Sequence, residues 1–494
     1  MTPTARVAAA FRRIAEVDRP EIWITLRDEA DVLVDAGAVE ARLAAGDTLP
    51  LAGLVVAVKD NVDVAGLPTT AGCPEFAYAP TASAAVVDRL CAAGAVVLGK
   101  TNLDQFGTGL VGTRSPYGAV RNSHHPHLVS GGSSSGSAVA VALGIADIGI
   151  GTDTAGSVRV PAALNGIFGI KPTLGILPTH GVVPACADFD AVSVLAADLD
   201  TAVAAAAAMA GPDARDPRSR SWPADVRLGA PAAPRVAIPE APNLAALSDA
   251  YRRAFEQTVV LATDAGLRVE PVDIALLLDA ALLLYDGAFV AERYAAVGEF
   301  LDTAPPGADP FVVSIIGAGR AITGPAFAAD VDALARARAA AAAMLAGFDA
   351  LLLPTTTEHP SLAEVRADPY SINRRMGTYT NFGNLLDMAA VAVPGVPTEA
   401  GTPFGVTIVS RTFADQIAVD IAARLSGTAS PLFVESGSEV AVFGDHRRGH
   451  PLHGQLEEVG ARYVRDLDGG ELFRISEAGL GHLVASQLAR AVIG

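Results

Sequence analysis

The stretch from Ser130 to Pro172 constrains this chain more than any other, because glycine- and serine-rich turns alternate in it with apolar segments. A first loop, SGGSSSGS, leads into the apolar run 138–146 and the strand-like piece 147–151, and a second tight turn closes at Ser157. Glycine tolerates positive φ and lets a ligand approach the backbone closely. The two turns therefore predict a functional site, with Ser133 and Ser157 as candidates.

The chemistry of these turns has three possible interpretations. A phosphate-binding loop of the P-loop type needs a lysine directly after the glycines, and none follows here. A flexible linker fits the composition of GGSSSGS but not the apolar sequence on both sides of it. The third is a serine nucleophile, Ser157, behind a turn in which the backbone N–H groups of Thr154, Ala155 and Gly156 converge as an oxyanion hole. A serine hydroxyl is a weak nucleophile and needs a base.

Lysine usage suggests which residue is that base. Of 36 basic residues only Lys59, Lys100 and Lys171 are lysines, so a retained lysine indicates a property that arginine lacks. Lysine can lose its proton when buried, and arginine in practice cannot. Lys59 ends the apolar run LVVAVK, where burial would lower its pKa and fit it to act as general base. The alternative is a lysine at a strand end whose amine reaches solvent.

The GGSSSGS loop, the GTDTAGS turn 24 positions after it and the upstream VAVKD together resemble the amidase signature family. That resemblance implies a Ser–cisSer–Lys triad. Ser157 would be the acyl-enzyme nucleophile, Ser133 the bridging serine after a cis peptide bond, and Lys59 the base. The N–H groups from Thr154 to Ser157 would form the oxyanion hole.

Further segments resemble the allophanate hydrolases within that family, among them PEIWITL, TNLDQFGTGLVGTRSPYGAVRN, HGVVPACADFDAVS, LLYDGAFVAERYAAV and RRMGTYTNFGNLLDMAAVAVP. The resemblance covers nearly all of residues 1–432. It implies that Tyr285 and Arg293 hold the substrate carboxylate, since arginine offers a fork of donors to such a group. A plain interpretation of the same helical stretch makes Tyr285 a core residue and Arg293 a surface partner of Glu292 or Glu299.

The implied reaction is hydrolysis of the terminal amide of allophanate, with ammonia released during urea degradation after a biotin-dependent urea carboxylase. No cofactor and no metal ion is expected. Two alternatives stay open within the family: the glutaminase-like A-type subunit of an amidotransferase, and an amidase for another small carboxylated or ureido amide. The third alternative is a non-catalytic scaffold on the same fold.

Alternating helices and strands predict an α/β fold with a mixed central β-sheet covered by helices on both faces. We expect an amidase domain over residues 1–434, with N-terminal helices within 1–48, and a shortened C-terminal domain over 435–494. Helices are predicted at 4–16, 28–45, 82–94, 198–210, 247–265, 275–299, 326–346 and 415–426. Strands are predicted at 53–59, 95–98, 235–239, 267–272, 349–354, 404–410 and 439–443.

Composition restricts partners and location. A net charge of −18 argues against nucleic acid and anionic membranes as partners. Three widely spaced cysteines give no disulfide framework, and the N-terminal segment has no signal-peptide core, so we expect a cytoplasmic protein. We also expect a homodimer that acts on a small molecule.

Three rival sites can be weighed from sequence. His124, His125 and His127 are close together, but a proline lies among them and no acid is near, which favours an exposed loop. The group His446, His450 and His453 contains Pro451, which would break a metal-binding helix, so we expect loop histidines. Cys186 would need His180 as its base, and the spacing gives no support for that pair.

Overall fold

The computed structural model describes residues 1–493, and the side chains of residues 1–485. Its body is built on one eleven-stranded sheet in the order β1-β3-β2-β4-β6-β5-β10-β11-β9-β7-β8. The strands are β1 (Trp23–Leu26), β2 (Val55–Lys59), β3 (Val96–Thr101), β4 (Ile148–Asp153), β5 (Phe168–Lys171), β6 (Ala191–Ala196), β7 (Arg235–Pro239), β8 (Arg268–Val272), β9 (Ala350–Pro354), β10 (Ala389–Pro394) and β11 (Gly405–Ser410).

The sheet is mixed, as predicted. Strands β2, β3 and β4 run parallel, and so do β7, β8 and β9, whereas the strands between these groups pair antiparallel. Both faces are buried, which explains why β2 is apolar up to its last residue, Lys59. Val56 and Val58 pack into the core on one face, and Val55 and Ala57 pack into a second core on the other.

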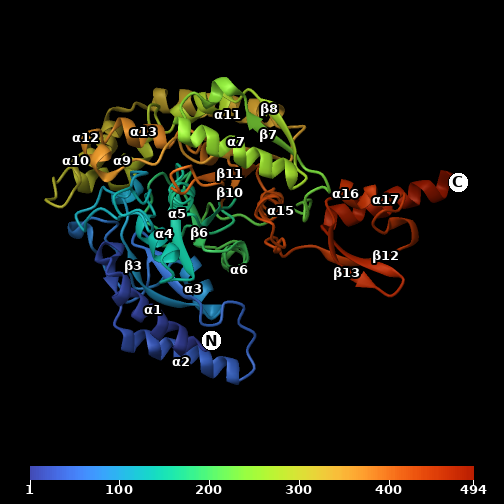
Figure 1. Cartoon of the computed structure of the whole chain (residues 1–494), viewed down its shortest axis with the longest axis horizontal. Coiled ribbons are helices and arrows are strands. Elements are labelled where there is room, and N and C mark those ends of the chain that lie inside the picture. Colours follow the sequence, from blue (N-terminus) through green and yellow to red (C-terminus); the bar gives the residue numbers. More distant parts are fainter. Residues whose placement is uncertain (494) are drawn as a thin grey trace.

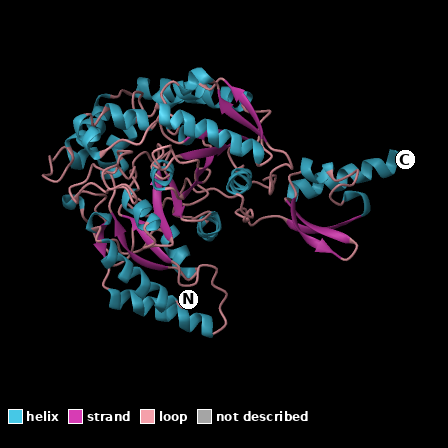
Figure 2. Cartoon of the chain, viewed as in Figure 1, coloured by secondary structure: helices cyan, strands magenta, loops and turns pink. Residues whose placement is uncertain are grey.

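Helices cover both faces of the sheet (Figures 1 and 2). Their starts follow ordinary capping chemistry, in which a side-chain oxygen accepts an unpaired N–H of the first turn: Thr2 caps α1, Ser248 caps α7 and Thr323 caps α11. The helices of the body are α1 (Pro3–Val17), α2 (Glu29–Ala44), α3 (Ala85–Ala92), α4 (Ser135–Ala142), α5 (Arg159–Asn165), α6 (Leu199–Met209), α7 (Asp249–Asp264), α8 (Ala275–Leu282), α9 (Val290–Leu301), α10 (Pro310–Gly317), α11 (Gly324–Met344), α12 (Leu362–Ala367), α13 (Ser371–Met376), α14 (Asn381–Leu385) and α15 (Asp415–Ser426).

One predicted helix is wrong in a way that matters for the site. The stretch 275–299 is not continuous: α8 ends at Leu282, turns follow, and α9 begins at Val290. Tyr285 therefore lies in the turn between the helices, while Arg293 lies on α9 and is buried. An apolar periodicity that runs through a break cannot be distinguished from one long helix by pattern alone.

Residues after the body form a second, three-stranded antiparallel sheet in the order β12-β14-β13, and Figure 1 shows it projecting from the body on the side of α15. Its strands are β12 (Ser438–Phe443), β13 (Arg462–Leu467) and β14 (Gly470–Ile475), with helices α16 (Gly454–Glu458) and α17 (Glu477–Ile493). A small core of its own, around Phe473 and Ile475, holds the unit together. The domain boundary at 434/435 stays a prediction.

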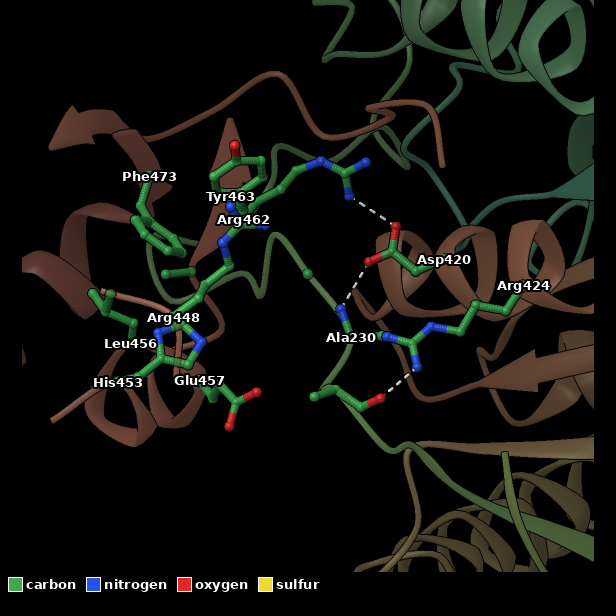
Figure 3. A pocket seen from close by; sticks show the side chains of 13 residues that line it. Ala230, Asp420, Arg424, Arg448, His453, Leu456, Glu457, Arg462, Tyr463 and Phe473 are labelled. Carbon is green, nitrogen blue, oxygen red and sulfur yellow. Dashed lines mark hydrogen bonds and ion pairs between the residues drawn. The ribbon is translucent and has the colours of Figure 1, made fainter. Parts of the chain in front are cut away.

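Figure 3 shows the junction between this unit and the body, which encloses a cavity of about 300 Å³. Asp420 on α15 joins the two parts: one carboxylate oxygen accepts from the Arg462 guanidinium at 2.8 Å and the other from the Ala230 N–H at 2.7 Å. The guanidinium of Arg424 donates to the carbonyl oxygens of Pro231 and Ala232. Every arginine around this cavity is already paired.

Among the described residues, no single helix is long and apolar enough to cross a membrane. One pair of helical segments, Pro310–Ala321 and Gly324–Met344, is long and apolar enough when the two are taken together, but they are bent by 101° relative to each other.

Candidate active site

Lys59 is the last residue of β2 and is fully buried. Its Nζ lies 2.7 Å from Ser133 Oγ, 2.8 Å from Thr152 Oγ1 and 3.2 Å from the Thr152 carbonyl oxygen. Burial lowers the pKa of Lys59 to about 7, although Asp104, Asp190 and Asp153 oppose that change. The amine can thus be neutral near neutral pH, and a neutral amine can accept the proton of the Ser133 hydroxyl.

All three lysines have this buried character, but only Lys59 reaches the serine loop. Lys100 forms an ion pair at 3.0 Å with Asp60, which is also fully buried. Lys171 donates to the Pro172 carbonyl at 2.7 Å. Desolvation also lowers the pKa of Lys100, and that of Lys171 to about 8. The alternative interpretation of Lys59 as a strand-end lysine whose amine reaches solvent is therefore wrong.

Ser133 lies two residues before α4 begins, in a tightly held loop. The peptide bond between Gly132 and Ser133 is cis, as the resemblance implies. A Cβ on Gly132 would lie 2.1 Å from Asp104 Oδ2, so only glycine fits there. Asp104 anchors the neighbouring loop by accepting N–H groups from Val111, Gly112 and Arg114. The sequence did not indicate this buried carboxylate.

Ser157 follows β4 in the turn that the sequence indicated. Gly156 has a φ of +122°, and a Cβ there would lie 2.3 Å from Thr380 Oγ1. The carbonyl oxygen of Ser157 accepts the N–H of Ser134 at 3.0 Å, which places Ser157 beside the loop that carries Ser133.

The predicted oxyanion-hole N–H groups differ in whether they already donate a hydrogen bond. The N–H of Gly156 donates to Asp153 Oδ1 at 2.9 Å. The N–H groups of Thr154 and Ser157 donate to no acceptor within the described part of the chain. These two are thus available for a substrate oxygen.

Two buried carboxylates, those of Asp153 and Asp190, hold this turn in place by hydrogen bonds, and the sequence indicated neither. Asp153 is fully buried and pairs with Arg159, whose Nη2 lies 2.8 Å from Asp153 Oδ1. Burial would raise the pKa of Asp153, but Arg159 outweighs it and brings that pKa to about 2. Asp190 accepts from the Thr154 hydroxyl at 2.5 Å and from the N–H groups of Ala185 and Cys186. Burial raises the pKa of Asp190.

Arg293 and Tyr285 lie together although they belong to different elements. Arg293 Nη2 donates to the Tyr285 hydroxyl at 3.0 Å, and Nη1 donates to Thr108 Oγ1 at 3.0 Å. The guanidinium carbon lies 4.8 Å from the centre of the Tyr285 ring. Arg293 is 1% exposed, so its interpretation as a surface partner of Glu292 or Glu299 is wrong. A buried guanidinium without an acidic partner at hydrogen-bond distance is suited to a carboxylate ligand.

The rival sites gain no support. Burial raises the pKa of the Cys186 thiol well above its usual range, and its Sγ lies 3.5 Å from the Phe289 carbonyl oxygen. His124 and His127 are exposed, as expected for a loop. No three His, Cys, Asp or Glu side chains among the described residues are grouped to hold a metal ion.

Comparison with known proteins agrees with this geometry. The amidase family model matches residues 5–418. A urea amidolyase of Saccharomyces cerevisiae is 40% identical over 486 residues, which is 92% of this chain and 26% of that protein. The A subunit of the glutamyl-tRNA(Gln) amidotransferase of Thermus thermophilus is 34% identical over 80% of this chain and 87% of its own length.

Among solved structures, the allophanate hydrolase of Kluyveromyces lactis superimposes with a TM-score of 0.89 at 35% identity, covering 98% of this chain and 89% of that one. The chain spans about a quarter of the length of the urea amidolyases that it matches. The family match covers well over half of the chain, and the chain therefore belongs to the amidase family.

Proposed function

We propose that this protein hydrolyses the terminal amide of allophanate and releases ammonia. The observation that carries the proposal is the pair of buried Arg293 and half-buried Tyr285, which offers a carboxylate site. In the same protein Lys59 is hydrogen-bonded to Ser133, and the Ser157 carbonyl oxygen accepts the N–H of the neighbouring Ser134. The likeness to an allophanate hydrolase over 98% of the chain supports the same substrate.

The proposed reaction begins with a proton relay. Neutral Lys59 accepts the proton of the Ser133 hydroxyl, which takes the proton of Ser157. Ser157 Oγ then attacks the terminal carbonyl carbon. The N–H groups of Thr154 and Ser157 stabilise the resulting oxyanion, with the neighbouring Ala155 and Gly156 completing the turn.

The tetrahedral intermediate collapses when the leaving nitrogen receives a proton back through Ser133, and ammonia departs. Water then attacks the acyl-enzyme by the same relay and frees Ser157. The product is N-carboxycarbamate, whose loss of CO₂ leads to a second ammonia. Arg293 and Tyr285 hold the substrate carboxylate throughout, which orients the amide toward Ser157.

A wider role follows from the relatives. We propose that the chain works with a biotin-dependent urea carboxylase that supplies allophanate, because the urea amidolyases it resembles extend far beyond the matched quarter. We place it in the cytoplasm, where its three free cysteines would stay reduced. A homodimer is also proposed, and size-exclusion chromatography with light scattering tests it.

The test of function is ammonia release from allophanate beside biuret, malonamate, glutamine and simple aliphatic amides, with Ser157→Ala as the blank. Preference for allophanate supports the proposal. Preference for glutamine would favour the second candidate, the A-type subunit of an amidotransferase, to which the Thermus thermophilus relative points. Activity only on other amides would agree with the proposed triad and would refute allophanate as the substrate.

A further inference from the structure

A hollow of about 810 Å³ lies beside the Arg293–Tyr285 pair. Its walls come from four segments that are distant in sequence: residues 110–114, residues 278–286, residues 315–318 and residues 370–381. Leu282, Ala318 and Tyr370 are exposed among its lining residues, so the hollow opens to solvent. Its inner part is buried, since Leu110 is 2% exposed.

Three of these walls lead directly to the active site. Tyr285 lines the hollow, and its hydroxyl accepts from Arg293. Arg114 also lines the hollow, and its Nη1 donates to the Thr108 carbonyl oxygen at 3.0 Å. The hydroxyl of the same Thr108 accepts a hydrogen bond from Arg293. Thr380 lies between the lining residues Thr378 and Asn381 and donates to the Ala155 carbonyl at 2.6 Å. The hollow therefore borders the Arg293–Tyr285 pair, and its fourth wall segment is hydrogen-bonded to the 154–157 turn through Thr380.

Arg114 provides a second observation. It is 3% exposed, and its Nε has no partner in the part of the chain that the structure describes. A buried N–H without an acceptor is costly unless water or a ligand pairs with it. The hollow thus has an unsatisfied cationic donor in its wall.

We propose that this hollow is the entrance through which the anionic substrate reaches Ser157, and that Arg374 at its rim is the first point of encounter for the carboxylate. Arg374 on α13 is 67% exposed and pairs at 2.5 Å with Asp286 in the turn after α8, so the pair spans the mouth between two walls. The net charge of −18 repels anions overall, which makes a cation at the mouth valuable. The nature of the substrate rests on the proposed function, whereas the route does not.

A second hollow, of about 490 Å³, is the rival route. It is lined by Asp190, Phe189 and Phe289, with Val331 at its rim. The second hollow reaches the Asp190 carboxylate, which accepts from the Thr154 hydroxyl. The Phe189 and Phe289 rings, which also line it, pack edge to face with their centres 5.0 Å apart. Because Val331 and Ala318 are both exposed apolar rim residues, they provide matched sites for a blocking side chain.

The route is tested by Ala318→Trp and Val331→Trp, with two measurements: the rate at which a small serine-directed phosphonate labels Ser157, and kcat/KM for allophanate. We expect Ala318→Trp to slow labelling by about 5- to 10-fold and Val331→Trp to leave it unchanged. The opposite pattern, or equal rates in both variants, would overturn the entrance. Labelling needs no turnover, so it reports the route even if allophanate proves not to be a substrate.

The role of Arg374 is tested by a pair of variants with opposite expected signs. Arg374→Gln should lower kcat/KM for allophanate by about 3-fold at low salt, and Asp286→Asn should raise it by a similar factor, because it frees the cation. Both effects should fade in about 0.5 M salt and be absent with a neutral amide. If both variants instead lower activity on charged and neutral substrates alike, or neither changes it, Arg374 has no encounter role.

Discussion

Replacing Lys59 with methionine should make the protein's stability depend less on pH. Lys59 is fully buried, and its pKa falls from 10.5 to about 7, which corresponds to roughly 5 kcal/mol against the ammonium form. The unfolded chain keeps the amine protonated up to about pH 10. Between these values the unfolded state binds more protons, so the stability of the wild-type protein rises with pH.

The sign and size of the difference follow. Below pH 7 the wild-type protein carries the full cost of a buried ammonium group, and methionine removes it. From pH 7 to pH 9 the free energy of unfolding of the wild-type protein should rise by roughly 2 kcal/mol relative to Lys59→Met. Titrations of Lys100 and Lys171 occur in both proteins and cancel in the comparison.

The assay is urea unfolding of both proteins at half-unit steps from pH 5.5 to pH 9.5, beside kcat/KM of the wild-type enzyme over the same range. We expect kcat/KM to rise with pH along a limb centred near pH 7, because we propose the neutral amine as the base. Parallel stability curves, together with no limb below pH 9, would refute a lowered pKa of Lys59 and its role in the relay.

Three further predictions concern side chains around Ser157, the proposed nucleophile. Arg293→Ala should raise KM for allophanate by about 100-fold and spare neutral amides, because only a carboxylate needs the guanidinium; equal losses on both would remove it from recognition. Asp190→Asn should lower kcat by about 10-fold with KM unchanged, whereas Asp216→Asn, which alters a carboxylate holding Thr179 in a nearby loop, should leave kcat unchanged. Asp153→Asn should destabilise the fold by about 3–5 kcal/mol in thermal unfolding, because it leaves a buried arginine unpaired, while Glu270→Gln on an exposed pair should cost below about 1 kcal/mol.

The sequence predicted most of the fold because apolar periodicity is strong in this chain. The predicted strand at 53–59 and the helix at 28–45 match β2 and α2 within two residues. The small strands β5 and β6 were missed, since the loop-rich sequence around them hides short pairing segments. The break between α8 and α9 was missed because its turn is as apolar as the helices.

Unusual residue types in the sequence predicted part of the site, and the contacts in the structure revealed the rest. Lys59 stood out as one of three lysines, and Ser157 stood out by its glycine-rich turn. Asp104 and Asp190 gave no such signal, because the sequence alone does not distinguish a buried aspartate that accepts backbone N–H groups from one exposed to solvent. Their roles depend on which distant amides the fold brings to them.

The burial of every lysine has a practical consequence for chemical labelling. Lys59, Lys100 and Lys171 have no exposed surface, so the folded protein presents no lysine amine to an acylating reagent or an amine-directed cross-linker. Reaction at a lysine would then report local or global opening of the fold. Mass spectrometry after brief acylation could follow unfolding at three named positions in the body without any engineered probe.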